Sequence, residues 1–303
     1  MTQSSPNLSF RWVEVRPSRA SVFMTYANRA VNKWGNSKPF LSGDLFSDEA
    51  DVSFFSPKFR RLKPSLKTIK QARVIFCPSS RLEEMLEAYS GIISPQVLIC
   101  GNDDRDFVDL PSRLPKSLKH LFLQNSFMPN SKFVTSLPIG IENLRWGKNG
   151  FPRLMKNGIP WSEKVNKVMV GPYGLTHEAR FQVRQSISRS SDLIELFESR
   201  LSPDELSAVS QRFKFIASVR GNGVDTHRHW ETAYRGSVAL IQKSAWLSNF
   251  ENAGLPFIGI ERFEEEEIQL ITSRLDFTPS NPQNIPILWW PYWKSKIQNS
   301  LAG

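Results

Sequence analysis

The stretch of sequence that decides the fold is residues 213–231, FKFIASVRGNGVDTHRHWE. Its apolar start, residues 215–217, is typical of the end of a buried strand, and a glycine loop at residues 221–223 follows it. Asp225 and Thr226 then offer side-chain oxygens that cap the first turn of a helix. The stretch therefore predicts a strand that enters a helix through a glycine loop.

A helix that begins after such a loop presents unpaired backbone N–H groups, and its dipole adds partial positive charge at the same place. An anion such as a phosphate is stabilised at that position. Arg220 and Arg228 flank the loop, and their guanidinium groups can hold phosphate oxygens with paired N–H donors. The sequence thus predicts a site for a phosphate-bearing ligand. The plainer alternative is that the glycine loop is only a tight turn.

From residue 71 onward, short apolar segments alternate with segments of helical periodicity. Strands are expected over residues 72–77, 96–100, 120–123, the segment leading to 137, 165–171, 213–217, 237–242 and 255–260. Helices are expected over residues 81–91, 177–187, 192–198, 203–211, after Thr226, over 262–270 and from Lys294. Polar residues cluster at the strand exits, as in an open α/β sheet whose ligands lie at the carboxyl ends of its strands.

We expect two α/β domains, residues 1–160 and 161–290, followed by a C-terminal helix over residues 291–303, with a ligand in the cleft between the domains. The loop-rich segment 147–163 suits the connection between them. Residues 1–70 are irregular, with turns expected at 34–36 and 42–44.

The chain of 303 residues carries a formal net charge of +10, which favours anionic partners. Nucleic acid, acidic lipid and phosphate-bearing substrates all meet that description. The segment 58–63, KFRRLK, is the nearest approach to a basic block, and it suits a helix face or a membrane-proximal patch equally well. The excess charge spread over a solvated surface is the alternative.

Cys77 and Cys100 lie in apolar, strand-like surroundings and are expected to be buried free thiols of a reducing compartment. The N-terminus lacks a signal-peptide pattern, and no run approaches the ~18–20 apolar residues of a membrane span. A soluble cytoplasmic protein is expected, with peripheral contact to a membrane surface left open.

Further polar candidates follow the strands of the first half: Asn102, Asp103, Asp104, Asn125, Glu142 and Asn143. They could hold a hydroxyl-rich acceptor, and Asp103 or Asp104 could act as a general base. Local capping of a turn is the competing explanation for each group.

His227 and His229 point about 200° apart at roughly 100° per residue of a helix, so they do not share a metal ion. His227 and Glu231 lie four residues apart on one helix face, which permits a hydrogen bond or an ion pair. Arg228 and Glu231 could equally form a structural salt bridge. No metal site is expected.

The sequence contains no Gly-x-Ser-x-Gly, His-Glu-x-x-His, Walker-type or paired Cys-x-x-Cys motif. The absence of these motifs disfavours most hydrolases, zinc enzymes and nucleoside triphosphatases.

Several segments of residues 95–295 resemble exostosin-like glycosyltransferases and bacterial proteins related to that group. The specific piece is SVRGNGVDTHRHWE at 218–231, followed by GSVALI at 236–241 and LPF at 255–257. Upstream, the segments GNDD at 101–104, LFLQN at 121–125 and LPIGIEN at 137–143 are similar to segments of the bacterial proteins.

The resemblance implies a GT-B fold, with an acceptor-side Rossmann-like domain and a second Rossmann-like domain that binds a nucleotide-sugar donor across a central cleft. It implies a donor site made of Arg220, Gly221, Asn222, Gly223, Asp225, Thr226, His227, Arg228 and Glu231. Arg228 would bind the diphosphate, Glu231 the ribose or sugar, and the two glycines would let the backbone approach the phosphates. The implied catalytic residues are Asp103, Asp104 and Glu231, the acceptor side is Asn102, Asn125, Glu142 and Asn143, and no metal or other cofactor is implied.

The function expected from this resemblance is transfer of a hexosyl or related sugar from a nucleotide diphosphate to a glycan or lipid-linked acceptor in surface-polysaccharide biosynthesis. The alternative is a non-catalytic nucleotide- or sugar-binding protein of the same fold. A nucleic-acid binder is a third hypothesis, motivated by charge alone; no nucleic-acid partner is expected.

Overall fold

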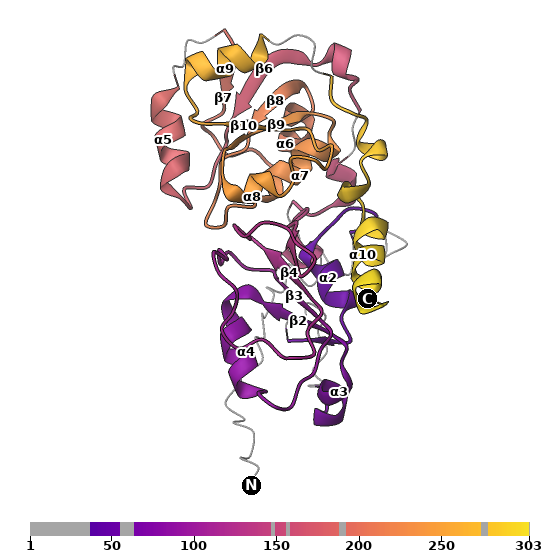
Figure 1. The fold of residues 1–303 in the computed structure, drawn as a ribbon. Coiled ribbons are helices and arrows are strands. Elements are labelled where there is room, and N and C mark those ends of the chain that lie inside the picture. The colour runs from indigo at the N-terminus through magenta and orange to yellow at the C-terminus, as the bar shows by residue number, and fades with distance from the viewer. Residues whose placement is uncertain are drawn as a thin grey trace.

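The computed structural model describes residues 37–54, 64–146, 149–155, 158–187, 192–273 and 278–302. The turn expected at residues 34–36 and the basic segment 58–63 lie outside these residues. The protein is an α/β structure with two parallel five-stranded sheets, one in each half of the molecule (Figure 1). The prediction of an α/β fold with strands entering helices is confirmed.

The first sheet has its strands in chain order: β1 (Val52–Ser53), β2 (Val74–Pro78), β3 (Val97–Gly101), β4 (His120–Gln124) and β5 (Val134–Leu137). Strands β2, β3, β4 and β5 are buried along their whole length, which explains why they read as continuous apolar runs. The helices of this half are α2 (Gly43–Glu49), α3 (Leu66–Gln71) and α4 (Leu82–Ala88). The turn expected at residues 42–44 is instead the start of α2.

The two cysteines are neighbours in this sheet, because Cys77 of β2 pairs in register with Cys100 of β3. Both are buried and free, as predicted. Burial raises the pKa of both thiols, which keeps them protonated.

The second sheet contains β6 (Val165–Val170), β7 (Ile194–Leu196), β8 (Phe213–Ala217), β9 (Val238–Gln242) and β10 (Phe257–Ile260). Its order is β10-β9-β8-β6-β7, so the chain steps from β6 to one side and then returns to the other side for β8. Open α/β sheets bind ligands where the strand order reverses in this way, at the carboxyl ends of the strands. Here that position is the exit of β6 and β8.

The helices of the second half are α5 (Glu178–Ser186), α6 (Pro203–Ser210), α7 (His227–Tyr234), α8 (Ala245–Ser248) and α9 (Glu265–Thr272). Helix α6 begins with a full capping box, in which Ser202 and Glu205 exchange hydrogen bonds. The loop-rich middle of the chain contains only short 3₁₀ turns among its described residues: η2 (Leu144–Trp146), η3 (Pro152–Met155) and η4 (Trp161–Glu163).

The helix expected over residues 192–198 was wrong, because residues 194–196 form the edge strand β7 paired with β6. Three residues give too short a pattern to distinguish a strand from a helix, and a partner distant in sequence decides the outcome.

The C-terminal helix α10 (Trp290–Ala302) starts four residues before the expected Lys294 and returns to the first half of the molecule (Figure 1). Trp290 and Trp293 pack edge-on against Phe46 of α2, with ring centroids 5.4 and 5.9 Å apart. The rings join a core cluster that includes Phe76, Ile99 and Phe122 of the first sheet. The end of the chain therefore stabilises the half from which it is most distant in sequence.

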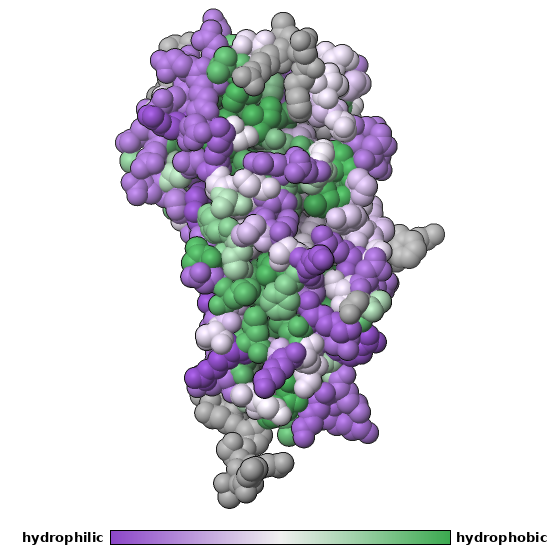
Figure 2. All heavy atoms as spheres, viewed as in Figure 1, coloured by the Kyte–Doolittle hydropathy of each residue, from purple (hydrophilic) through white to green (hydrophobic). Residues whose placement is uncertain are grey.

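The face of the molecule seen in Figure 2 is hydrophilic over α5, on the left of the upper half. None of the helices in the described part of the chain combines the length and apolar character that a bilayer crossing needs.

Candidate functional site

A cavity of about 300 Å³ lies at the carboxyl ends of β6 and β8, where the strand order reverses. Its walls come from the loop after β6 (Tyr173, Gly174), the glycine loop after β8 (residues 221–223) and the first turn of α7. Asp104 and Ile139 of the first half also line it. The cavity is thus formed by both halves of the molecule.

Arg180 of α5 lies on the cavity wall, and backbone carbonyls hold its guanidinium group. Its Nε donates to the carbonyl of Arg220 at 3.0 Å, and its Nη1 donates to Gly174 O at 3.0 Å and to Thr176 Oγ1 at 2.9 Å. Carbonyl and hydroxyl oxygens orient the guanidinium but do not neutralise its charge.

Backbone carbonyls also hold the guanidinium group of Arg228 in α7. Its Nη1 donates to Gly171 O at 3.2 Å, and its Nη2 donates to Pro172 O at 3.3 Å. Both acceptors lie directly after β6. The position of Arg228 is therefore set by the strand exit and not by a carboxylate.

The two guanidinium groups influence each other. Burial lowers the pKa of Arg180, and the positive charge of Arg228 lowers it further. None of the ion pairs between described residues includes Arg180 or Arg228. Two neighbouring cations without a carboxylate partner at a cavity wall create an electrostatic site for an anion.

Thr226 occupies the N-cap position of α7, but its hydroxyl makes no capping hydrogen bond, contrary to expectation. Its Oγ1 is buried in the lining of the cavity and has no hydrogen-bond partner among the residues that the structure describes. A buried hydroxyl normally has a partner, so this one is available to a ligand oxygen. The first turn of α7 adds the partial positive charge of its dipole at the same place.

Asp225 has a structural role that the sequence did not indicate. Its Oδ1 accepts from Trp230 Nε1 at 2.7 Å, and its Oδ2 accepts from the backbone N–H of Ile139 at 2.7 Å. Burial raises the pKa of Asp225 to about 8, although the N–H donors that it accepts from favour the ionised form. The carboxylate connects α7 with the first half of the molecule; it does not cap the helix.

The glycine loop is also shaped by contact with the first half. A Cβ atom on Gly223 would lie 2.8 Å from the amide atoms of Asn125. A Cβ on Gly221 would lie 3.1 Å from Arg180 Nη2. Glycine at position 223 leaves room for the Asn125 amide, and a Cβ at position 221 would have to displace the end of the Arg180 side chain.

Arg220 points to the first half and does not line the cavity. Its Nη2 lies 3.1 Å from Asp106 Oδ2 in an ion pair and donates to Asn222 O at 3.0 Å. The Nδ2 of Asn222 in turn donates to Asp104 Oδ2 at 3.2 Å. Arg220 therefore connects the two halves at the rim of the cavity, which differs from the expected donor contact.

Glu231 lines the cavity and is buried, with Oε2 at 3.6 Å from Nη1 of the buried Arg235. Neither of the predicted pairings, with His227 or with Arg228, occurs among the described ion pairs and hydrogen bonds of Glu231. His227 also lines the cavity, and its Nδ1 donates to Gly140 O at 2.8 Å.

His229 points away from the cavity, as its spacing from His227 predicts. Its ring is fully buried: Nε2 donates to Val224 O at 3.2 Å and Nδ1 accepts from Ser218 Oγ at 2.6 Å. Burial lowers the pKa of His229 to about 3, so the ring is neutral at neutral pH.

The two candidate bases of the first half differ in position. Asp103 lies outside the cavity lining, and its carboxylate accepts from the backbone N–H groups of Ser80 at 2.6 Å and Arg105 at 3.0 Å. Those bonds cap the local turns. Asp104 is exposed and lines the cavity. The geometry thus favours Asp104 over Asp103 as a group that could meet a substrate.

The four residues expected on the acceptor side form connections within the protein instead of lining the cavity. Asn102 Oδ1 accepts from Asn143 Nδ2 at 2.8 Å, and Asn143 Oδ1 accepts from the backbone N–H of Asp44 at 2.8 Å. Glu142 Oε2 accepts from the backbone N–H of Asn149 at 2.8 Å, and Asn125 accepts from Asp225. Local structural bonding, the competing explanation, accounts for their positions.

Sequence reasoning missed Arg180 and the aromatic residue beside it, Tyr173, whose hydroxyl donates to Ala217 O at 2.8 Å. The N-cap of α5 is His177, whose Nδ1 accepts from the backbone N–H of Ala179 at 3.1 Å. The available signal was the spacing of Thr176 and Arg180, four residues apart at the beginning of a helix that follows a strand.

No group of three His, Cys, Asp or Glu side chains within the described ranges is arranged to hold a metal ion. A scan against protein-family models finds no model that matches the chain, and a search of the curated proteins finds no match either.

Proposed function

We propose that this protein is a glycosyltransferase of GT-B type, which transfers a sugar from a nucleotide-diphosphate donor to a glycan or lipid-linked acceptor. The observation that carries the proposal is the pair Arg180 and Arg228 at the reversal of strand order, held by carbonyls and without a carboxylate among the described ion pairs. A bound diphosphate would supply the negative charge that balances these two guanidinium groups.

In this proposal the leaving nucleoside diphosphate lies between the two guanidinium groups and the first turn of α7. Negative charge develops on it as the bond between the anomeric carbon and the phosphate oxygen breaks, and fixed positive charge stabilises that transition state. The unpartnered hydroxyl of Thr226 can donate to one of its oxygens.

The acceptor hydroxyl attacks the anomeric carbon and transfers its proton to a base as the new glycosidic bond forms. Asp104 takes the role of base, because it is the carboxylate that the first half contributes to the cavity lining. Buried Glu231, on the opposite wall, accepts hydrogen bonds from the donor ribose or sugar.

The test is calorimetric titration with a panel of nucleoside diphosphates and nucleotide sugars, with an RNA oligonucleotide as a further ligand. We expect one nucleoside diphosphate to bind, and Arg228→Ala to weaken it by roughly 1.5–3 kcal/mol, the contribution of charge-assisted hydrogen bonds. Arg184→Ala is the matched control: Arg184 lies one helical turn from Arg180 and pairs with Glu198.

Three results would contradict the proposal. Equal binding by the folded Arg228→Ala variant would place the diphosphate elsewhere. Binding of donor without turnover on any acceptor would favour a non-catalytic binding protein. Binding of RNA alone, with a steep loss of affinity as salt rises, would favour a nucleic-acid binder.

A further inference from the structure

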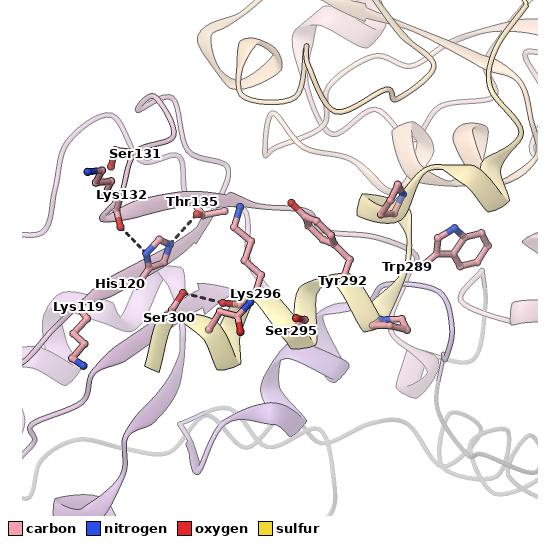
Figure 3. A pocket seen from close by; sticks show the side chains of 13 residues that line it. Lys119, His120, Ser131, Lys132, Thr135, Trp289, Tyr292, Ser295, Lys296 and Ser300 are labelled. Carbon is pink, nitrogen blue, oxygen red and sulfur yellow. Dashed lines mark hydrogen bonds between the residues drawn. The ribbon is translucent and has the colours of Figure 1, made fainter. Parts of the chain in front are cut away.

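A second, larger cavity of about 920 Å³ lies at the opposite end of the first sheet. His120, the first residue of β4, and Thr135, near the start of β5, form one wall, together with Lys132 (Figure 3). Helix α10 forms the other wall with Tyr292 and Lys296. The cavity shares no lining residue with the cavity at the strand exits, so it is a separate site.

The charged lining of this groove is positive. Lys119, Lys132 and Lys296 line it, and within the described part of the chain no carboxylate is among the lining residues. No ion pair between described residues includes any of the three lysines. A concave surface with one sign of charge attracts ions of the opposite sign.

Lys296 is the central cation. Its Nζ lies 5.9 Å from the ring centroid of Tyr292 and 5.8 Å from that of Trp293, so aromatic faces stabilise the charge in part. Burial lowers the pKa of Lys296, which means that its charge is incompletely solvated. An anion in the groove would restore the lost solvation.

His120 contributes structure to the groove and not charge. Its Nδ1 donates to the carbonyl of Lys132 at 3.0 Å, and its Nε2 accepts from Thr135 Oγ1 at 2.9 Å. Burial lowers the pKa of His120, which keeps the ring neutral. The histidine therefore fixes the backbone at Lys132, and this orients the loop that carries one of the cations.

The remaining lining favours a sugar. Trp289 and Tyr292 offer ring surfaces, and the hydroxyl and amide groups of Ser131, Ser295 and Asn299 offer hydrogen bonds. Aromatic rings beside a few polar groups are typical of pockets that bind small organic molecules, and the volume falls in the usual range of ~300–1,000 Å³.

A membrane surface is a poorer match for this region. Protruding apolar side chains strengthen docking to lipid, and of the large hydrophobic residues exposed in the described ranges, Tyr292 alone lines the groove. The surface is concave, which suits a chain laid into it and not a flat bilayer.

We propose that this groove binds an acidic oligosaccharide, whose carboxylate or sulfate groups pair with Lys132 and Lys296 while a sugar ring packs against Tyr292. The inference does not rest on the glycosyltransferase proposal, because the two cavities are separate.

The experiment is calorimetric titration of the whole protein with sulfated maltohexaose and with a hexamer of galacturonic acid, using uncharged maltohexaose as the matched control. We expect at least one acidic hexamer to bind and maltohexaose not to bind. Lys296→Gln and Lys132→Gln should each weaken the acidic hexamer about tenfold, the effect of losing one charge-assisted hydrogen bond.

Lys294→Gln is the control variant, because Lys294 lies on the same helix, is exposed and does not line the groove. It should bind as the unaltered protein does. Circular dichroism and a thermal melt of each variant establish that it is folded; each variant removes one positive charge and shortens the side chain by one atom.

The proposal is overturned if neither acidic hexamer binds, or if Lys132→Gln, Lys296→Gln and Lys294→Gln all bind like the unaltered protein. It is also overturned if the lysines govern binding to phosphatidylglycerol vesicles while neither hexamer binds, since the groove would then recognise a lipid headgroup.

Discussion

The side-chain oxygen of Asn125, directly after β4, accepts a hydrogen bond from the backbone N–H of Asp225 at 2.9 Å. The side chain of Asp225 also bonds to the first half, because its Oδ2 accepts a hydrogen bond from the backbone N–H of Ile139. Asn125 has a φ of 55°, a left-handed conformation that asparagine tolerates better than most residues. These two hydrogen bonds hold the loop before α7, which forms part of the cavity wall, against the first half of the molecule.

The first prediction concerns Gly223, where an added Cβ would lie 2.8 Å from the Asn125 amide. Gly223→Ala should lower the free energy of unfolding by about 1–3 kcal/mol, because the loop or the amide must shift. Chemical denaturation measures this change in the free energy of unfolding. Gly174→Ala is the control, since its Cβ would meet nothing closer than 3.9 Å, and equal losses in the two variants would refute the role of the close approach.

The second prediction concerns the buried bond from Trp230 Nε1 to Asp225 Oδ1. Trp230→Phe should lower the free energy of unfolding by about 1–3 kcal/mol more than Trp246→Phe does, because it leaves Oδ1 of Asp225 without its donor. Trp246 belongs to the same core cluster and is equally buried, but its Nε1 has no hydrogen-bond partner in the described ranges. Comparing the two variants by urea denaturation therefore separates the bond from the lost volume.

The third prediction concerns acid stability. Since burial lowers the pKa of His229 to about 3 from 6.5, the unfolded chain binds a proton between these values that the folded protein does not. The contribution of the neutral His229 ring to the free energy of unfolding is therefore fully present above pH 6.5 and is lost as the pH falls toward 3. From pH 7 to pH 5 the free energy of unfolding should drop by about 2 kcal/mol on this account.

Denaturation of His229→Gln at the same two pH values tests this origin. The variant has no titrating ring at this position, so from pH 7 to pH 5 its free energy of unfolding should fall by about 2 kcal/mol less than that of the unaltered protein. An identical pH dependence in the variant and the unaltered protein would assign the acid sensitivity to other groups.

The fourth prediction concerns turnover. Asp104→Asn should reduce the rate of sugar transfer by roughly 10²–10⁴-fold, the usual contribution of a general base, while nucleoside diphosphate binding stays within twofold. Asp109→Asn is the control, because Asp109 is exposed and lies outside the cavity lining. A full rate in folded Asp104→Asn would exclude Asp104 as the base.

Much of the fold follows from local sequence. The strands over residues 72–77, 96–100 and 213–217 were predictable because strands buried on both faces are continuous apolar runs. Strand β7 was not predictable, since its three residues become a strand only through pairing with β6. The return of α10 to the first sheet likewise depends on Phe46, far away in the chain.

Part of the candidate site was likewise predictable from the sequence, and part depends on tertiary contacts. Sequence pointed to the glycine loop and Arg228, and both line the cavity. It did not distinguish Arg220, which pairs with Asp106, from Arg180, which lies on the cavity wall beside Arg228. Side-chain direction at a loop is set by partners from other elements, and the spacing of residues does not encode it.

The sequence by itself determined that a buried strand passes through a glycine loop into a helix at residues 213–234, because apolar runs and glycine turns act over neighbouring residues. The tertiary structure alone decided which charges meet. Strands β6 and β8 are adjacent in the sheet although β7 and α6 separate them in the chain, and this adjacency brings Arg180 and Arg228 to one wall. Electrostatic energy depends on distance in space, so the anion site exists only once the sheet has formed.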